Sequence, residues 1–322
     1  AYITGAKKGI IYLRAEYKYL LEKLRNTIAE FKEKGFLGKQ ICGIKNFNFN
    51  ITIQLGAGAY VCGAETALIE SLEGKRGEPR IRKYFPTEFG YLGYSTVVNN
   101  VETFAKAARI IELGADFFSN IGTVNSKGTK ILSISGDVAK PGIFEVEWGI
   151  TIKELLLLSQ ATAPYFIQIT GPSGECINES EFNRKICKED LLCGGAVMVF
   201  NRFRSVIQII ENFVKFFNKE SCGSCTPCRA GNQILLEKIK KMKQGICTTK
   251  DLNDIKEWGN IIALSSRCGL GQTSANTFIM ALDKFKNYFD LKVMSCDTNC
   301  SIEFDMEAAV FDYDNLIKNT QY

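Results

Sequence analysis

The sequence predicts an α+β protein built from several domains, and three patterns along its 322 residues support this prediction. A strand, a helix and a second strand follow one another near the start, alternating apolar and polar residues fill the middle, and amphipathic segments fill much of the last third. A chain of this length can form two or three domains, each with its own hydrophobic core.

The first third has the order of elements that is typical of an α/β layer. Residues 9–17 predict a buried strand, and residues 18–35 predict a helix because apolar side chains recur there at helical spacing. A second strand ends at Leu55, a turn containing glycines follows, and a second helix starts at about Glu65.

The middle of the chain predicts a small mixed β domain that starts near Gly128. Apolar and polar residues alternate in "KILSISGDVAKPGIFEV", with a turn at residues 140–142, and a short helix follows. The stretches "YFIQITGPSGECI" and "AVMVFNRF" predict further strands.

Four amphipathic segments after Ser205 predict a helical bundle, because short loops join them. They cover residues 205–221, 230–245, 249–266 and 274–289. The tail, residues 291–322, is acidic, and we expect it to lie along the surface.

The composition excludes several classes of function. The 40 Lys and Arg against 35 Asp and Glu give a net charge of only +5, spread along the chain, so we expect no nucleic-acid partner. The chain has no histidine, which excludes imidazole catalysis and histidine-ligated zinc within it. No apolar run is long enough to span a membrane, and the first residues do not resemble a signal peptide, so we expect a cytoplasmic protein.

Twelve cysteines in such a protein indicate reduced thiols used for metal or redox chemistry. Cys222, Cys225 and Cys228 in "SCGSCTPCRAG" have the C-x2-C-x2-C spacing of a [4Fe-4S] cluster site. The fourth ligand must come from elsewhere, and Cys268 in "SSRCGLGQT" is the natural candidate, because a helical bundle could bring the two loops together.

Zinc is the competing interpretation of these cysteines. Zinc sites with four cysteines usually use two separated pairs, however, and not a triplet with a distant single residue. Cys296 and Cys300 form a further C-x3-C pair in the tail, where two more ligands would be needed to hold a metal ion.

A glycine-containing loop between the second strand and the second helix is a candidate phosphate site. Gly56, Gly58 and Gly63 lie there, and the exposed backbone N–H groups at such a helix start suit an anion. Downstream, Asn99 and Asn100 could hydrogen-bond a flavin ring or its ribityl chain, although two asparagines in a turn explain the pattern equally simply.

Taken together, five ordered stretches resemble the FMN- and NAD(H)-binding flavoprotein subunit of respiratory complex I. The same family includes the diaphorases of NAD-reducing hydrogenases and the β subunit of NAD-dependent formate dehydrogenases. The stretches are "GAGAYVCGAETALIESLEGKRGEPR", "VNNVET", "GTKILSISGDVAKPGIFEV", "ESCGSCTPCRAG" and "CGLGQT". The similarity is greater to the hydrogenase and formate dehydrogenase branch, and it extends over residues 1 to about 312.

The resemblance implies a particular domain order and a set of cofactors. Residues 1–127 would be the C-terminal part of an α/β FMN- and NAD-binding domain, and residues 128–203 would be a ubiquitin-like β-grasp domain. Residues 204–290 would be a four-helix bundle that binds a [4Fe-4S] cluster, and residues 291–322 would be a tail. It assigns the cluster to Cys222, Cys225, Cys228 and Cys268. It assigns FMN and NAD(H) to Gly56, Gly58, Tyr60, Gly63, Ala64, Glu65, Val98, Asn99, Asn100 and Thr103.

The resemblance also implies the activity. NADH would deliver a hydride to FMN, which would pass single electrons to the cluster, or electrons would run the other way towards NAD+, so no catalytic side chain is assigned. The partners would be a small [2Fe-2S] thioredoxin-like subunit and an iron–sulfur subunit of a larger complex, which could place the protein peripherally at a membrane without direct insertion.

Two departures from the family pattern bear on this expectation. The family has a glycine-rich segment, G-R-G-G-A-G-F, which would lie before residue 1, so the chain by itself is expected to hold half of the nucleotide pocket. The alternative function is therefore an iron–sulfur wiring module that holds no flavin on its own. The second departure is Ala64, where the family usually has glutamate, and its loss would relax discrimination against NADP(H).

Overall fold

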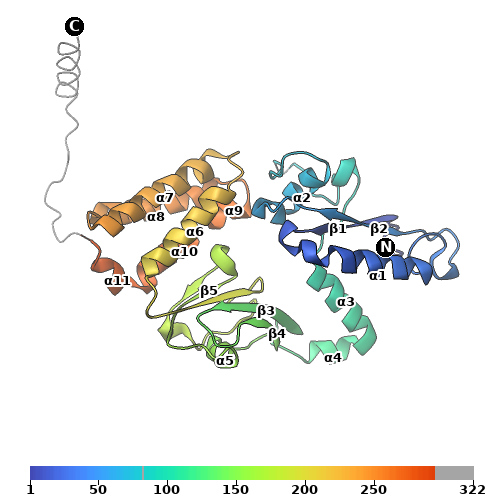
Figure 1. The fold of residues 1–322 in the computed structure, drawn as a ribbon, viewed down its shortest axis with the longest axis horizontal. Helices are drawn as coiled ribbons and strands as arrows, with labels where there is room; N and C mark the ends of the chain where they lie inside the picture. The colour runs from blue at the N-terminus through green and yellow to red at the C-terminus, as the bar shows by residue number, and fades with distance from the viewer. Residues whose placement is uncertain (82, 294–322) are drawn as a thin grey trace, which may run out of the picture.

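The computed structural model describes residues 1–81 and 83–293, which form a mixed α and β structure with three regions along the chain (Figure 1). Most of the predicted tail, including Cys296 and Cys300, lies outside the described residues. Within them, every helix is too short or too polar to cross a membrane.

The first region contains the predicted strand–helix–strand unit. Strands β1 (Lys8–Leu13) and β2 (Asn50–Leu55) pair in parallel, and helix α1 (Leu21–Glu33) connects them. A parallel pair needs a crossover of this kind, because a tight hairpin can join only antiparallel strands. The prediction that the first strand continues to residue 17 is wrong, because a 3-10 helix (Ala15–Leu20) follows the strand.

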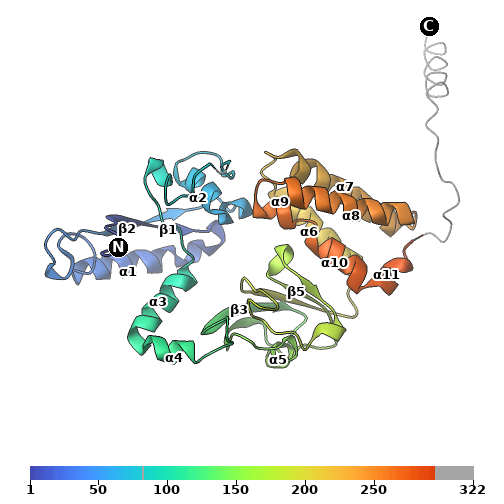
Figure 2. The ribbon, with the colours of Figure 1, turned by 180° about the vertical axis from the view of Figure 1, so that it is seen from behind.

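Two helices that the sequence analysis did not predict connect the first region to the second. Helix α3 (Val101–Leu113) begins at Asn100, whose side chain accepts a hydrogen bond from the N–H of Glu102, and it ends at Gly114 with φ +90°. Helix α4 (Ala115–Ser119) follows, and both views show the pair running from the first region to the sheet (Figure 2).

The second region is a five-stranded mixed sheet. Its strand order is β4-β3-β7-β5-β6, with β3 and β7 parallel and the other neighbours antiparallel. The predicted turn at residues 140–142 joins β3 to β4, because Ile134 pairs with Gly142. The strands are β3 (Thr129–Gly136), β4 (Gly142–Glu147), β5 (Pro164–Ile169), β6 (Cys176–Ile177) and β7 (Ala196–Asn201).

Helix α5 (Ile152–Leu158) provides part of the core of this sheet. A capping box formed by Thr151 and Glu154 begins the helix, and Ile152 and Leu155 are fully buried. They pack with alternate residues of β3 and β7, which explains the alternating sequence pattern, because residues two apart in a strand point to the same face.

The third region is helical. Its three long helices, α6 (Val206–Glu220), α7 (Thr226–Gln244) and α8 (Thr249–Ser265), confirm the first three amphipathic segments, although α7 begins four residues before the predicted start. The last segment is not one helix but two, α10 (Asn276–Lys284) and α11 (Lys286–Asp290). A short helix, α9 (Gly269–Thr273), precedes them.

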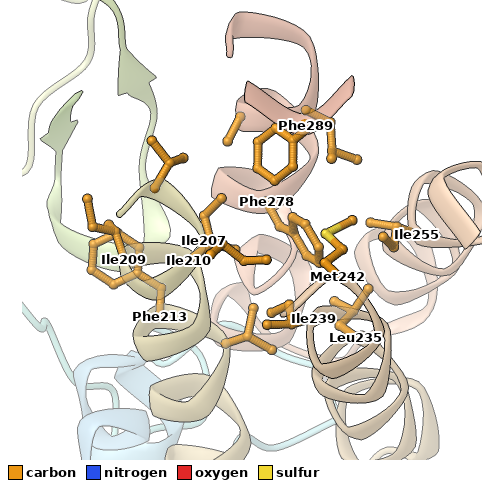
Figure 3. Packing of buried hydrophobic residues seen from close by; sticks show 14 of the residues in the cluster. Ile207, Ile209, Ile210, Phe213, Leu235, Ile239, Met242, Ile255, Phe278 and Phe289 are labelled. Carbon is orange, nitrogen blue, oxygen red and sulfur yellow. The ribbon is translucent and has the colours of Figure 1, made fainter. Parts of the chain in front are cut away.

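One apolar core joins the helices to the sheet. Figure 3 shows Ile210 of α6, Ile239 of α7, Ile255 of α8 and Phe278 of α10 together in this core. The break between α10 and α11 lies at a contact with the sheet: the backbone of Phe285 leaves helical geometry with φ −118° and ψ 37°, and its ring stacks on Phe166 of β5 at 5.1 Å between centroids.

Candidate functional site

Three of the four predicted cluster ligands lie in the loop between α6 and α7 and in the first turn of α7. Cys225 is the residue directly before α7, and Cys228 lies in the first turn of that helix. Cys228 is buried, with 4% of its surface exposed, whereas Cys222 and Cys225 are half-buried. Gly223 has φ +76°, a value that a glycine adopts without strain, and this lets the chain turn between the first two cysteines.

The structure brings Cys268 to these three residues. Cys268 is the residue directly before α9, and all four cysteines pack in one cluster with Phe217 and Leu270. A Cβ atom at Gly271 would lie 3.1 Å from the Cβ of Cys228, so the start of α9 packs closely on the first turn of α7. The loop contact expected from the sequence is therefore present.

The electrostatics of Cys228 reflect this proximity. Burial raises the pKa of the Cys228 thiol, and the charges that the neighbouring Cys225, Cys268 and Cys222 would carry raise it further. A hydrogen bond with Ser221 acts in the opposite direction and lowers it. The four thiols therefore lie close enough for a charge on one of them to affect the ionisation of Cys228.

The thiol arrangement fits an iron–sulfur cluster. Among the described residues, no three Cys, Asp or Glu side chains lie close enough together to hold one metal ion. A [4Fe-4S] cluster makes a different demand, because it is held by four separate cysteine thiolates around a group of irons. Four cysteines lie in one apolar cluster here, with Cys228 deepest, and four is the number of thiolates that such a cluster needs.

Two polar side chains reach the sulfur of Cys228. The hydroxyl oxygen of Ser221 is 3.3 Å from it, and the side-chain nitrogen of Asn232 is 3.6 Å from it. Neither residue was predicted from the sequence. A signal for Asn232 was available, because it follows Cys228 by four positions and therefore lies one helical turn further along the same face.

The glycine loop lies between β2 and α2 (Glu65–Leu72), as predicted. Gly56 is buried, and a Cβ there would lie 2.7 Å from the hydroxyl of Tyr12, so only glycine fits without a shift. Gly58 has φ +86°. A short 3-10 helix (Tyr60–Gly63) then leads into α2, and the exposed Glu65 begins that helix.

Tyr60 holds this loop against the rest of the molecule. Its backbone N–H donates to the carboxylate of Glu220 at the end of α6, at 3.0 Å. Its hydroxyl lies 3.2 Å from that of Ser173, and its ring packs edge-to-face on Phe216 at 5.0 Å between centroids. The predicted flavin loop is thus anchored to the helix that precedes the cysteine loop.

The glycine loop and the start of α2 pack in the same apolar cluster as the four cysteines. Val61, Cys62 and Ala67 belong to the same apolar cluster as Cys228, and both ribbon views show α9 beside the turn that leads into α2 (Figures 1 and 2). Cys62 is buried, and a Cβ at Gly77 would lie 2.5 Å from its sulfur.

Residues 76–79, which follow α2, contact both cysteine-bearing loops through polar groups. These contacts were not predicted from the sequence, because the spacing of residues 76–79 does not indicate a partner that is distant in the chain. The hydrogen-bonded pairs are Arg76 with the carbonyl of Cys222, Ser224 with the carboxylate of Glu78, and Arg267 with the carbonyl of Pro79.

The second predicted flavin segment, Val98 to Thr103, lies at the start of α3. Asn99 and Thr103 are exposed and Val98 is half-buried, while the side-chain oxygen of Asn100 accepts from the N–H of Glu102 at 2.8 Å. Among the described residues, no side-chain hydrogen bond joins this segment to the glycine loop. Capping is thus the observed role of Asn100, and the flavin contacts of the segment stay a prediction.

Comparison with known proteins identifies the family. Residues 1–109 match the model of the Nuo51 FMN-binding domain, and residues 208–292 match that of the NADH-ubiquinone oxidoreductase-F iron-sulfur binding region. The chain is 34% identical over 305 residues to an F subunit of the NADH-quinone oxidoreductase of Rhizobium meliloti. The aligned region covers 90% of this chain and 71% of that protein. The chain belongs to the family of the NADH-quinone oxidoreductase F subunits.

Hydrogenase subunits are similar as well. The chain is 46% identical to the NAD-reducing hydrogenase HoxS subunit alpha of Cupriavidus necator, over all of this chain and 54% of that protein. A crystal structure of NAD+-reducing [NiFe]-hydrogenase in the H2-reduced state matches with a TM-score of 0.84 and 36% identity, covering 98% of this chain and 54% of the other. The chain thus spans about half the length of these hydrogenase relatives.

Proposed function

We propose that this chain passes electrons between NAD(H), FMN and a [4Fe-4S] cluster as one subunit of a larger dehydrogenase or hydrogenase complex. The packing of the glycine loop and the four cysteines in one apolar cluster carries this proposal, because electron transfer between a flavin and an iron–sulfur cluster needs their binding sites to adjoin. When bound, FMN exchanges a hydride with NAD(H) and single electrons with the cluster. The chain's own residues hold and orient both groups.

The proposed ligands are Cys222, Cys225, Cys228 and Cys268 for the cluster. For the flavin and the nucleotide, we propose the loop of residues 56–65 and the start of α3 at residues 98–103. The left-handed conformation of Gly58, with φ +86°, supports the first of these segments, because a glycine at this point of the loop leaves the backbone near the start of α2 free of side-chain bulk.

The proposed domain division follows the three regions. Residues 1–127 would belong to an α/β FMN- and NAD-binding domain, which the parallel β1–α1–β2 unit supports. Residues 128–203 would form a ubiquitin-like β-grasp domain, which the five-stranded mixed sheet and α5 support. Residues 204–290 would form the cluster-binding helical bundle, and residues 291–322 a tail.

Metal and flavin analysis of the purified protein tests the proposal. We expect iron, acid-labile sulfide and the absorbance of FMN. Cys268→Ala should abolish the electron paramagnetic resonance signal of the reduced [4Fe-4S] cluster. The matched control is Cys247→Ala, because Cys247 is equally a free cysteine but is buried in the core away from the cluster ligands. This control should keep the signal.

Each of the other outcomes has a definite meaning. Zinc in place of iron would overturn the redox assignment. A cluster without flavin would favour the iron–sulfur wiring module over the flavoprotein. A [4Fe-4S] signal that survives Cys268→Ala unchanged would remove Cys268 from the ligand set.

The relatives of this chain indicate the kind of assembly in which it works. NADH-quinone oxidoreductase and NAD-reducing hydrogenase relatives are named as subunits, which supports a multisubunit assembly for this chain. We propose a small [2Fe-2S] thioredoxin-like subunit and an iron–sulfur subunit as partners, in the cytoplasm. Co-purification from the native source tests this, and a protein that purifies alone with full activity would contradict it.

A further inference from the structure

We propose that Ser221 and Asn232 donate hydrogen bonds to the thiolate of Cys228 and thereby raise the reduction potential of the cluster that Cys228 holds. The inference rests on the proposed function, since it needs a cluster at these cysteines. It assigns a role to two polar side chains that cluster ligation itself does not use. Neither residue would contact the irons, so both are positioning residues that would act on the reduction potential through the sulfur of Cys228.

The hydrogen bonds around Ser221 orient its hydroxyl. The backbone N–H of Gly223 donates to the Ser221 hydroxyl oxygen at 3.2 Å. With one of its lone pairs occupied in this way, the hydroxyl has its hydrogen available for the Cys228 sulfur at 3.3 Å. A metal-bound thiolate carries no proton and can only accept, so Ser221 is the donor in the loaded protein.

Asn232 presents a second donor from α7. Its side-chain nitrogen carries two hydrogens and has two acceptors on one residue, the carbonyl oxygen of Cys228 at 2.9 Å and its sulfur at 3.6 Å. This arrangement holds the amide over the sulfur from the helix side, whereas Ser221 approaches from the preceding loop. The two donors therefore contact the same sulfur from separate elements.

An asparagine at position 232 of α7 lowers the stability of the folded chain, which indicates a role beyond packing. Asparagine is a poor helix former, and Asn232 is fully buried in the interior of α7. Among the described residues, its side-chain oxygen accepts no hydrogen bond. An apolar residue of similar size would avoid both costs. Buried polar groups that are unfavourable for the local structure are expected at functional sites.

The electrostatic consequence follows from burial. Cys228 is the most buried of the four thiols, and a hydrogen bond to a charged acceptor is stronger where water is excluded. A cluster that gains an electron places more negative charge on its sulfurs, so donors aimed at one of them stabilise the reduced state more than the oxidised state. Hydrogen bonds to the sulfurs are among the factors that set cluster potentials.

Potentiometric titration of the cluster-loaded protein, read by electron paramagnetic resonance, tests this proposal. Ser221→Ala and Asn232→Leu should each shift the midpoint potential to a more negative value, and the double variant should shift it further. Ser221→Thr keeps a hydroxyl and should restore a potential close to that of the original protein.

Ser274→Ala is the matched control. Ser274 is also a buried serine near the ligand loops, but its hydroxyl donates to the carbonyl of Gly271 at 3.0 Å and, within the part of the chain that the structure describes, to no sulfur. Its removal should leave the potential unchanged. A shift as large as that of Ser221→Ala would show that loss of any nearby hydroxyl perturbs the cluster, and would overturn the inference.

The remaining outcomes separate this inference from the proposed function. Absence of any [4Fe-4S] signal in the original protein would overturn both. An intact cluster with equal potentials in all variants would overturn the inference alone. If Ser221→Ala loses the cluster, retention by Ser221→Thr would support the hydroxyl's role, whereas loss from both variants would contradict it.

Discussion

Ala64 is the residue directly before α2, at the end of the glycine loop, and it is half-buried beside the cysteine cluster. A carboxylate near an adenosine ribose accepts from its 2′-hydroxyl and repels a 2′-phosphate. The hypothesis that alanine here relaxes discrimination against NADP(H) is therefore a property of a single side chain at this helix start.

Ala64→Glu tests the hypothesis on the complete enzyme. We expect the ratio of kcat/KM for NADH to that for NADPH to rise by about tenfold, which corresponds to about 1.4 kcal/mol of differential binding. Ala59→Glu places the same charge five residues earlier in the loop and should change the ratio less. An unchanged ratio in Ala64→Glu would end the hypothesis.

Glu73, directly after α2, binds the following segment to that helix. Burial alone would raise the pKa of Glu73, but hydrogen bonds from Lys75, from the N–H of Leu92 and from Arg80 outweigh burial and lower it to about 2. Because the folded-state pKa lies below the ordinary value of 4.5, the stabilisation is present above about pH 4.5 and is lost as the pH falls towards 2.

Pepsin cleavage within residues 83–96 measures this pH dependence, since the protease works in acid and the segment is rich in aromatic residues. Relative to a denatured substrate, we expect cleavage to accelerate as the pH falls from about 4.5 to about 2. Glu73→Gln should already be cleaved rapidly at about pH 4.5. The exposed Glu112→Gln is the control, and an identical profile for Glu73→Gln would contradict the prediction.

At the scale of elements, the helices of the third region depend on close backbone approach. Gly259 of α8 faces α10, and a Cβ there would clash with Ile279 and lie 3.2 Å from the Cβ of Ala275. A glycine in a helix interior costs up to about 1 kcal/mol relative to alanine, so its presence here reflects packing and not propensity.

Gly259→Val should therefore lower the free energy of unfolding by about 1–3 kcal/mol, because extra carbon atoms overpack the α8–α10 contact. Ile279→Ala removes the clashing side chain. The double variant should be less destabilised than the sum of the two single variants by about 1 kcal/mol or more, measured by denaturant unfolding. Simple additivity would contradict the packing explanation.

The element predictions succeeded where periodicity was strong and failed where tertiary contacts decided. The β1–α1–β2 order, the hairpin at residues 140–142 and three long helices follow from the sequence pattern. Helix α3 was missed although Asn100 and Gly114 mark its two ends, and like α1 it buries none of its residues. The break at Phe285 was missed because no glycine or proline marks it, and the ring on which Phe285 stacks, Phe166, lies more than a hundred positions away.

At the scale of the whole molecule, Lys284 joins the helical region to the sheet. Its ammonium group donates to the carboxylates of Glu175 and Glu181 and to the carbonyl of Cys176, each at 2.8–2.9 Å. Only 19% of its side chain is exposed, so these bonds are partly shielded from water. Gln168 of β5 adds a buried hydrogen bond to Thr277 of α10 at 3.0 Å.

Lys284→Met keeps the length of the side chain but removes its charge and donors. We expect a loss of about 1–3 kcal/mol in the free energy of unfolding, because two carboxylates lose a partner at a half-buried contact. Lys286→Met, at a position with 75% side-chain exposure, should change the free energy by less than about 0.5 kcal/mol. Equal effects of the two variants would contradict the interface role.

The sequence by itself determined the thiol triplet, the candidate fourth cysteine, the glycine loop and the family resemblance, because each depends on residue type at short spacing. Only the tertiary structure decided that Cys268 packs with the triplet, that the glycine loop lies against them, and that Ser221 and Asn232 reach the sulfur of Cys228. The physical reason is that these contacts join segments through helix packing and buried polar groups, which no local pattern encodes.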